Sequence, residues 1–269
     1  MIPSAAVTTS KALRAARELL SQRNESLVAQ CVDLLASLGD PAHFDALLAG
    51  TTWTPPQAPN TFGELTPGVA LDIAPHRGAW RLWAALRLIA AAPEGSVGAS
   101  LRQAITSLHV HRRVNEDEAL PADLAPLAAL RNLTSLCIDD VATLCNLSAL
   151  ATLPSLERLS ITQRQGRIDL SGLAGSPALR ELTVYGAELA GETPLALPAL
   201  QRLDLFSVGM LVGLALVEGM PSLDYARINN ITACNDLSPF GACTALRELR
   251  FLRGAAHLTN LRGLEPCVA

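Results

Sequence analysis

The clearest pattern in the sequence is a repeat of apolar positions that runs from residue 105 to residue 251. Each copy reads apolar-x-x-apolar-x-apolar, and successive copies start 28, 23, 23, 21, 23 and 23 residues apart. Apolar residues that alternate with polar ones are typical of a β-strand with one buried face. The copies are Ile105/Leu108/Val110, Leu133/Leu136/Ile138, Leu156/Leu159/Ile161, Leu179/Leu182/Val184, Leu200/Leu203/Leu205, Leu223/Ala226/Ile228 and Leu246/Leu249/Phe251. Because one unit cannot bury its apolar face alone, the pattern predicts stacked units that share one core and one parallel sheet.

The strand segments of these repeats resemble those of the leucine-rich-repeat family. The resemblance is carried by LPSLERLSI, SPALRELTV, LPALQRLDL, MPSLDYARI and CTALRELRF, and the 23-residue period is similar to that of the short, internalin-like class. It implies an α/β solenoid, a right-handed horseshoe with a parallel sheet on its concave face. The family usually has Asn three residues after the last apolar strand position. Here those positions hold Val141, Arg164, Ala187, Val208, Ile231 and Gly254.

Two segments between strands begin with an aspartate, DLSGL at 169–173 and DLSPF at 236–240. An Asp side chain accepts hydrogen bonds from the first backbone N–H groups of a helix. We therefore expect Asp169 and Asp236 each to start a short helical turn.

The N-terminal part follows a different, helical periodicity. Apolar residues over 9–38 recur at three- and four-residue spacing, Gly39 suits a helix C-cap, and Asp40-Pro41 suits the start of a third helix. This arrangement is weakly similar to a HEAT-type helical pair. Residues 51–68 are rich in Pro and Thr and predict a linker or an ordered loop, and 78–92 predict a helix, with Trp80 and Trp83, that covers the first repeat. We expect two parts: 1–100, a helical region and cap, and 101–269, about seven repeats.

Composition narrows the classes of function. The 269 residues are 49% hydrophobic and 17% charged, which excludes a disordered chain. The net charge of −4 argues against nucleic acid as a partner. The sequence has no membrane-length apolar run and no secretory signal, and its six cysteines form no tight framework, which predicts a cytoplasmic protein with reduced thiols. Lys11 is the only lysine among 21 basic residues, a bias that favours a bacterial origin.

The residues that alternate with the buried ones predict the exposed face of the sheet. Both tyrosines of the chain fall on this face, with a phenylalanine and several arginines close by in strand order. Tyrosine and arginine on a rigid platform are typical of binding hot spots. The alternative is that the aromatic residues only pack against neighbours on the sheet, and that Arg158, Glu181 and Arg202 form a structural charge ladder. The candidate partner-binding residues are Arg158, Tyr185, Arg202, Phe206, Tyr225, Arg227 and Arg250.

A second group on this face is His109 and His111 beside Cys137 and Asp139. These residue types bind zinc, and neighbouring strands bring them side by side. Since a flat sheet holds side chains nearly parallel, we expect coincidence rather than a metal site, and no cofactor. A thiol catalytic site lacks a sign of an oxyanion hole, and no P-loop, GxGxxG strand turn or HExxH is present.

The sequence therefore predicts a non-catalytic protein-interaction module that binds a protein partner on the concave face, not an enzyme. One alternative is a regulatory subunit that docks on and controls an enzyme, and another is a metal or thiol site at His109/His111/Cys137/Asp139. An extracellular adhesin like the internalins fits poorly with the missing signal and unpaired cysteines. The last repeat lacks a cap, so we expect a fragment, a covering partner or a homodimer through that end, where Leu258, Leu261 and Leu264 continue the pattern.

Overall fold

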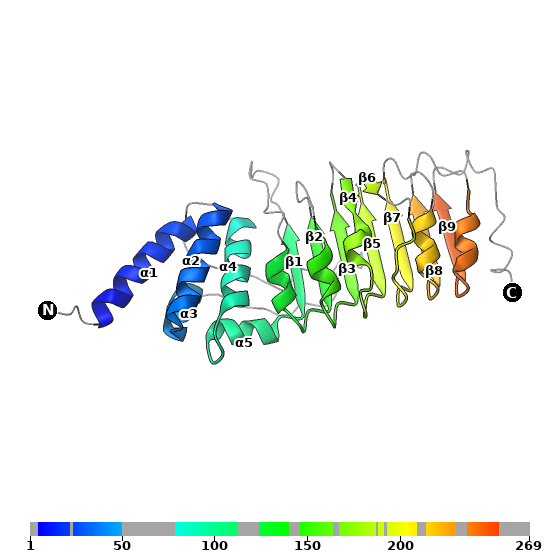
Figure 1. Ribbon diagram of the computed structural model, residues 1–269. Coiled ribbons are helices and arrows are strands. Elements are labelled where there is room, and N and C mark those ends of the chain that lie inside the picture. Colours follow the sequence, from blue (N-terminus) through cyan, green and yellow to red (C-terminus); the bar gives the residue numbers. More distant parts are fainter. Residues whose placement is uncertain are drawn as a thin grey trace, which may run out of the picture.

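The computed structural model describes most of the chain. The described residues are 5–21, 24–49, 79–111, 124–139, 146–163, 167–186, 188–190, 193–208, 214–229 and 236–252. Within them, five α-helices precede a row of parallel strands, and the two parts form one elongated body (Figure 1).

The repeats form one sheet of seven parallel strands in the order β1-β2-β3-β5-β7-β8-β9. Equivalent residues of successive repeats pair in register, so that Leu136 lies beside Leu159, Leu159 beside Leu182 and Leu182 beside Leu203. The predicted parallel sheet and all seven predicted strands are confirmed. Their bounds are β1 Ser107–His111, β2 Ser135–Asp139, β3 Arg158–Thr162, β5 Glu181–Tyr185, β7 Arg202–Phe206, β8 Tyr225–Asn229 and β9 Glu248–Leu252.

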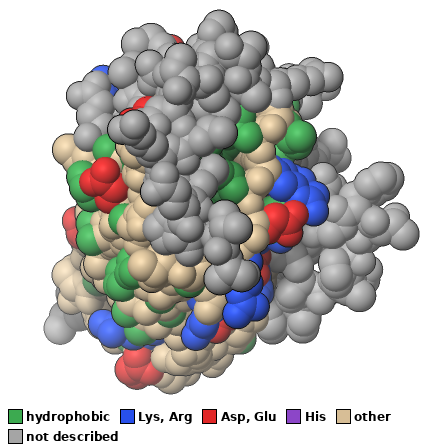
Figure 2. Space-filling model, turned by 90° about the vertical axis from the view of Figure 1, so that its right-hand side faces the viewer, with side chains coloured by type: hydrophobic (Ala, Val, Ile, Leu, Met, Phe, Trp, Pro, Cys, Tyr) green, Lys and Arg blue, Asp and Glu red, His purple; other side chains and the backbone are tan. Residues whose placement is uncertain are grey.

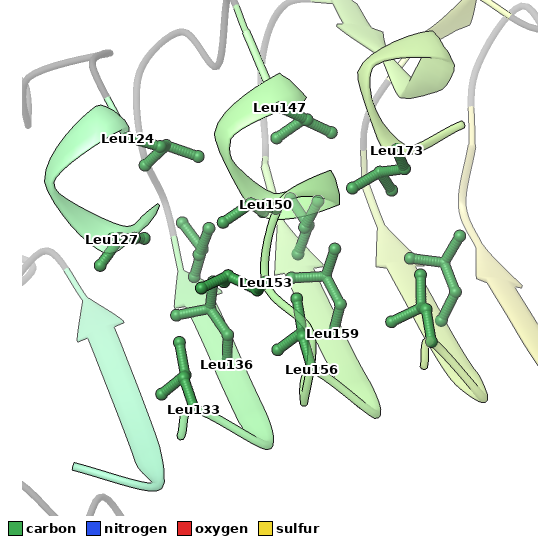
Figure 3. Packing of buried hydrophobic residues seen from close by; sticks show 14 of the residues in the cluster. Leu124, Leu127, Leu133, Leu136, Leu147, Leu150, Leu153, Leu156, Leu159 and Leu173 are labelled. Carbon is green, nitrogen blue, oxygen red and sulfur yellow. The ribbon is translucent and has the colours of Figure 1, made fainter. Parts of the chain in front are cut away.

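The apolar residues of the repeat fill the space behind the sheet. In Figure 3, leucines from the strands, such as Leu136 and Leu159, meet leucines from the return segments, such as Leu127 and Leu150. On the inner strands these side chains are buried, while Val110 on β1 and Phe251 on β9 are only partly buried. Each of the two outer strands has one neighbouring strand instead of two, which explains the difference.

The chain returns between strands through short helical turns. They are η1 Ala125–Ala129, α6 Ser148–Ala151, η2 Leu170–Leu173, η3 Ala215–Gly219 and η4 Ser238–Ala242. As predicted, the Asp169 carboxylate accepts the N–H of Ser171 at 2.8 Å and the Asp236 carboxylate accepts the N–H of Ser238 at 2.8 Å. Asn146 accepts the N–H of Ser148 at the start of α6 in the same way, a contact that was not predicted from the sequence.

The return side also holds a small sheet that the repeat pattern did not predict. β4 (Arg167–Asp169) pairs in parallel with β6 (Glu188–Ala190). Successive return segments pack closely here and further along the chain. A Cβ atom added at Gly219 would lie 2.2 Å from the carbonyl oxygen of Leu195, so only glycine fits at that point.

The N-terminal helices are α1 Ala5–Ser21, α2 Glu25–Leu38, α3 Pro41–Leu48, α4 Ala79–Ala91 and α5 Val97–Ala104. Gly39 ends α2 in the left-handed region, at φ 64°, and Asp40 caps α3 through the N–H of Ala42, as predicted. Within the predicted apolar series on α2, Leu34 and Leu38 are exposed. The part boundary expected at 100/101 falls inside α5, and the segment 51–68 lies outside the described residues.

Helix α4 joins the helical part to the repeats. It packs against η1 and β1, where Trp83 is buried, and so covers the first repeat as predicted; the side chain of Trp80 lies outside the described part. Arg102 of α5 donates to the carbonyl oxygens of Ile89, Ala90 and Ala92 at the end of α4. One apolar cluster therefore extends from the helices into the last repeat. The C-terminal end, with the predicted apolar residues at 258, 261 and 264, lies outside the described residues.

No helix in the described ranges combines the length and the apolar character that crossing a membrane requires.

Leu159 tests the importance of the shared core. We expect Leu159→Ala to lower the free energy of unfolding by about 2–5 kcal/mol, because the buried side chain leaves a cavity between neighbouring repeats. Urea unfolding measures the change. The control is Leu252→Ala, the same substitution at a side chain that is 48% exposed, with an expected change within about 0.5 kcal/mol. Equal losses in the two variants would contradict the stacked core.

Asp169 tests the caps of the return segments. Its hydrogen bonds to Ser171 lower the pKa of its carboxyl group. A lowered pKa in the folded state means that the stabilisation is present at neutral pH and is lost as the pH falls through that pKa. We expect Asp169→Ala to cost about 1 kcal/mol at pH 7, and less at pH 3, in urea unfolding. A cost that is the same at both pH values would show that the charged carboxylate is not the cap.

Candidate functional site

The exposed face of the sheet consists of three rows of side chains, because strand residues alternate and the strands pair in register. In the first row Glu181, Arg202, Tyr225 and Glu248 follow one another across β5, β7, β8 and β9. The middle row there is Thr183, Asp204, Arg227 and Arg250, and the third is Tyr185, Phe206, Asn229 and Leu252. Six of the seven candidate binding residues thus lie on these four neighbouring strands, and Arg158 lies on the adjacent β3, beside Glu181.

Asp204 organises this part of the face. Its side chain is only 5% exposed, and the Nε of Arg202 donates to its Oδ2 at 2.7 Å. The Nε of Arg227 approaches Oδ1 at 3.0 Å, as an ion pair without the alignment of a hydrogen bond. Burial is the largest single influence and lowers the pKa of Arg202. The hydrogen bond to Asp204 and the charges of Asp204, Tyr225 and Glu181 together outweigh burial, so the pKa is raised. One buried carboxylate therefore holds two arginines in place.

The arginines that surround this carboxylate stack on the aromatic rings. The guanidinium of Arg202 lies 4.3 Å from the ring centre of Tyr225, and that of Arg227 lies 4.3 Å from the ring centre of Phe206. Arg250 approaches Tyr225 from the next strand at 5.7 Å. Tyr185 and Phe206 are 6.2 Å apart, with their rings tilted by 36°. We call these six residues with Asp204 the aromatic–arginine patch.

The patch remains accessible although its members touch one another. Tyr185 is 48% exposed, and the side chains of Phe206, Tyr225 and Arg227 are half-buried. Figure 2, drawn from the C-terminal side, shows basic side chains next to acidic ones among apolar groups. The aromatic residues therefore both pack against neighbours on the sheet and reach the surface.

Arg158, Glu181 and Arg202 are register neighbours, as the expected charge ladder requires, but no direct ion pair joins them in the described part of the chain. Among the described residues, Arg158 makes its ion pair with Glu157 at 3.8 Å, while Arg202 turns to Asp204 instead of Glu181. Asp204 lies on the predicted exposed face, but the pattern of apolar residues does not distinguish it from the other polar residues there. The signal that could have found it is its place in register beside Arg227 and two residues from Arg202.

The opposite end of the same face holds a second cluster. His109 and Cys137 are register partners on β1 and β2, and Asp139 follows Cys137 on the same face. The Nε2 of His109 lies 2.5 Å from the Oδ2 of Asp139, and the thiol of Cys137 donates to Oδ1 at 3.6 Å. The bond to Asp139 and a bond to Cys137, opposed by burial, raise the pKa of His109 to about 10. The side chain of His111 lies outside the described part.

The carboxyl group of Asp139 responds to this contact in the opposite direction. Burial raises its pKa, but hydrogen bonds from His109 and Thr162 together outweigh burial, and the pKa is lowered. His109 and Asp139 therefore form a charged pair at neutral pH. The expectation that the sheet would hold these side chains parallel is wrong for this pair, since they converge.

Comparisons with known proteins find similar proteins among the solved structures. No protein-family model and no curated protein matches it. It is similar to internalin InlF of Listeria monocytogenes, with a TM-score of 0.39 and 21% identity, over 69% of this chain and 65% of that chain. It is also similar to internalin C2 of the same organism (TM-score 0.43, 19% identity, 68% and 87% covered) and to the mouse RP105/MD-1 complex (TM-score 0.41, 23% identity, 54% and 25% covered). The chain thus spans less than two thirds of the first and the third.

At these identities and TM-scores the similarity carries no argument about function. The deciding observation is in the chain itself, where units of about 23 residues each contribute one strand to a parallel, in-register sheet and return through a short helical turn. The chain has a leucine-rich-repeat fold. The two clusters accordingly lie at opposite ends of the sheet face of a leucine-rich-repeat solenoid.

Asp204 tests how the patch is held. We expect Asp204→Ala to lower the free energy of unfolding by about 1.5–3 kcal/mol, since two guanidinium groups lose their shared acceptor. Urea unfolding at pH 7 measures the loss. The control is Glu248→Ala, which removes an exposed ion pair to Arg250 and should cost less than about 1 kcal/mol. A loss at Asp204 no larger than that at Glu248 would argue against its organising role.

Proposed function

We propose that this leucine-rich-repeat protein is a non-catalytic interaction module that binds a protein partner through the aromatic–arginine patch. The observation that carries the proposal is the buried carboxylate of Asp204 with Arg202 and Arg227 fixed on it, each stacked on an aromatic ring. Tyrosine and arginine are the residue types enriched in binding hot spots.

The order of the patch in the free protein favours tight binding. Long side chains usually lose conformational freedom when a partner immobilises them, which costs about 0.5–1.5 kcal/mol for each. Arg202 and Arg227 are already held by Asp204, and Arg250 is held by Glu248 at 2.5 Å. A partner that meets this patch therefore avoids part of that cost.

The charge balance of the patch indicates the chemistry of the partner. Three arginines face Asp204, Glu248 and the nearby Glu181, so the positive charges are matched by negative ones. Such a surface lacks the excess of positive charge that a phosphate backbone requires. It suits a protein surface that offers apolar groups to the rings and hydrogen-bond acceptors to the guanidinium groups.

The partner is tested by affinity capture from the source cells, with the captured protein quantified by mass spectrometry and then titrated in purified form. We expect Tyr225→Ala to weaken binding by about 2 kcal/mol, which is about thirtyfold in Kd. Phe206→Ala and Tyr185→Ala should also weaken it. The matched control is Glu218→Ala on η3, an exposed position on the return side, which should bind as the wild type does.

Two results would contradict the proposal. One is a captured partner that binds all three aromatic variants with wild-type affinity, which would place the interface elsewhere. The other is loss of binding in Glu218→Ala equal to that in Tyr225→Ala. The identity of the captured protein then decides whether the chain serves as a regulatory subunit of an enzyme.

A further inference from the structure

We propose that His109, Cys137 and Asp139 bind a Zn²⁺ ion at the β1–β2 end of the exposed sheet face. This site is independent of the aromatic–arginine patch, which lies on β5, β7, β8 and β9. One strand, β3, separates β2 from β5, the nearest strand of the patch, so β2 and β5 lie about 10 Å apart.

The first argument is convergence. One ligand atom from each of the three side chains lies within 4.8 Å of the other two. The two oxygens of Asp139 each contact one of the other side chains: Oδ2 lies 2.5 Å from His109 Nε2, and Oδ1 lies 3.6 Å from Cys137 Sγ. Zinc bonds of about 2.0–2.3 Å in a tetrahedron place ligand atoms about 3.5 Å apart. Movements of about 1 Å in the side-chain atoms would therefore bring the three ligand atoms to these separations.

The second argument is the donor set. An imidazole nitrogen, a thiolate sulfur and a carboxylate oxygen are all ligands of Zn²⁺, whereas Ca²⁺ and Mg²⁺ prefer oxygen alone. Thr162, the register partner of Asp139 on β3, hydrogen-bonds the carboxylate and so orients it. Such a neighbour is typical of the shell that positions metal ligands.

The third argument is access. The three side chains are half-buried on a face that solvent reaches, so an ion can enter without opening the core. Three protein ligands leave one position of a tetrahedral zinc ion for water or for a donor atom of a bound partner.

The test uses the full chain, freed of metal with a chelator that is then removed, and titrated with Zn²⁺ in a calorimeter. We expect one zinc ion per chain. Cys137→Ser keeps the size of the side chain but removes the thiolate, and should weaken binding at least tenfold. Co²⁺ in place of Zn²⁺ should give a thiolate-to-metal charge-transfer band in the wild type that is missing in Cys137→Ser.

A matched control and a folding check complete the experiment. Ser160→Ala, at the register partner of Cys137 on β3, should keep wild-type affinity for Zn²⁺. Zn²⁺ should raise the unfolding midpoint of the wild type and of Ser160→Ala more than that of Cys137→Ser, because an ion that binds only the folded state stabilises it in proportion to its affinity. Unfolding without metal verifies that each variant is folded. Absence of zinc binding in the wild type, or unchanged binding in Cys137→Ser, would overturn the proposal.

Discussion

The in-register stacking of apolar side chains is the constraint on which the rest of the structure depends. Each buried leucine of one repeat lies beside the equivalent residue of the next, as Leu159 does between Leu136 and Leu182. A shift of one residue would turn every apolar side chain toward water, so the register is strongly fixed. The same alternation fixes which residues face outward, and the positions of both clusters follow from the core rather than from contacts of their own.

Because the fold depends on the apolar repeat, the sequence predicts those elements that the repeat defines. All seven main strands follow from the apolar period, because burial alone defines them. β4 and β6 could not be found in this way, since they are three-residue contacts between return segments that carry no repeat. The caps were partly predictable: Asn146, Asp169 and Asp236 each stand 13 residues after the first leucine of their repeat, so one shared position starts three return segments. In a chain without the family's usual asparagine, these side chains bond the backbone at the start of the turns.

The contacts within the candidate site were less predictable than its location. Register placed Arg202 beside Glu181, but its guanidinium reaches Asp204 on its own strand, and Arg250 likewise turns to Glu248. A long side chain such as that of Arg202 has several rotamers, and it adopts the one that reaches the buried carboxylate of Asp204. His109 behaves in the same way, since it crosses to Asp139 and departs from the parallel arrangement that a flat sheet implies. Sequence pattern thus predicts the face, while the pairs on it depend on side-chain geometry.

Asp204 also offsets the repulsion between neighbouring arginines on the sheet. Arg227 and Arg250 are register partners on neighbouring strands, and Arg202 lies on the next strand, so three positive charges lie on three adjacent strands. Like charges that lie opposite each other destabilise a sheet. A carboxylate buried between two of them, and Glu248 beside the third, remove this repulsion and fix the guanidinium groups against the rings. The same negative charges that let the sheet tolerate these arginines therefore also give the patch its order before any partner arrives.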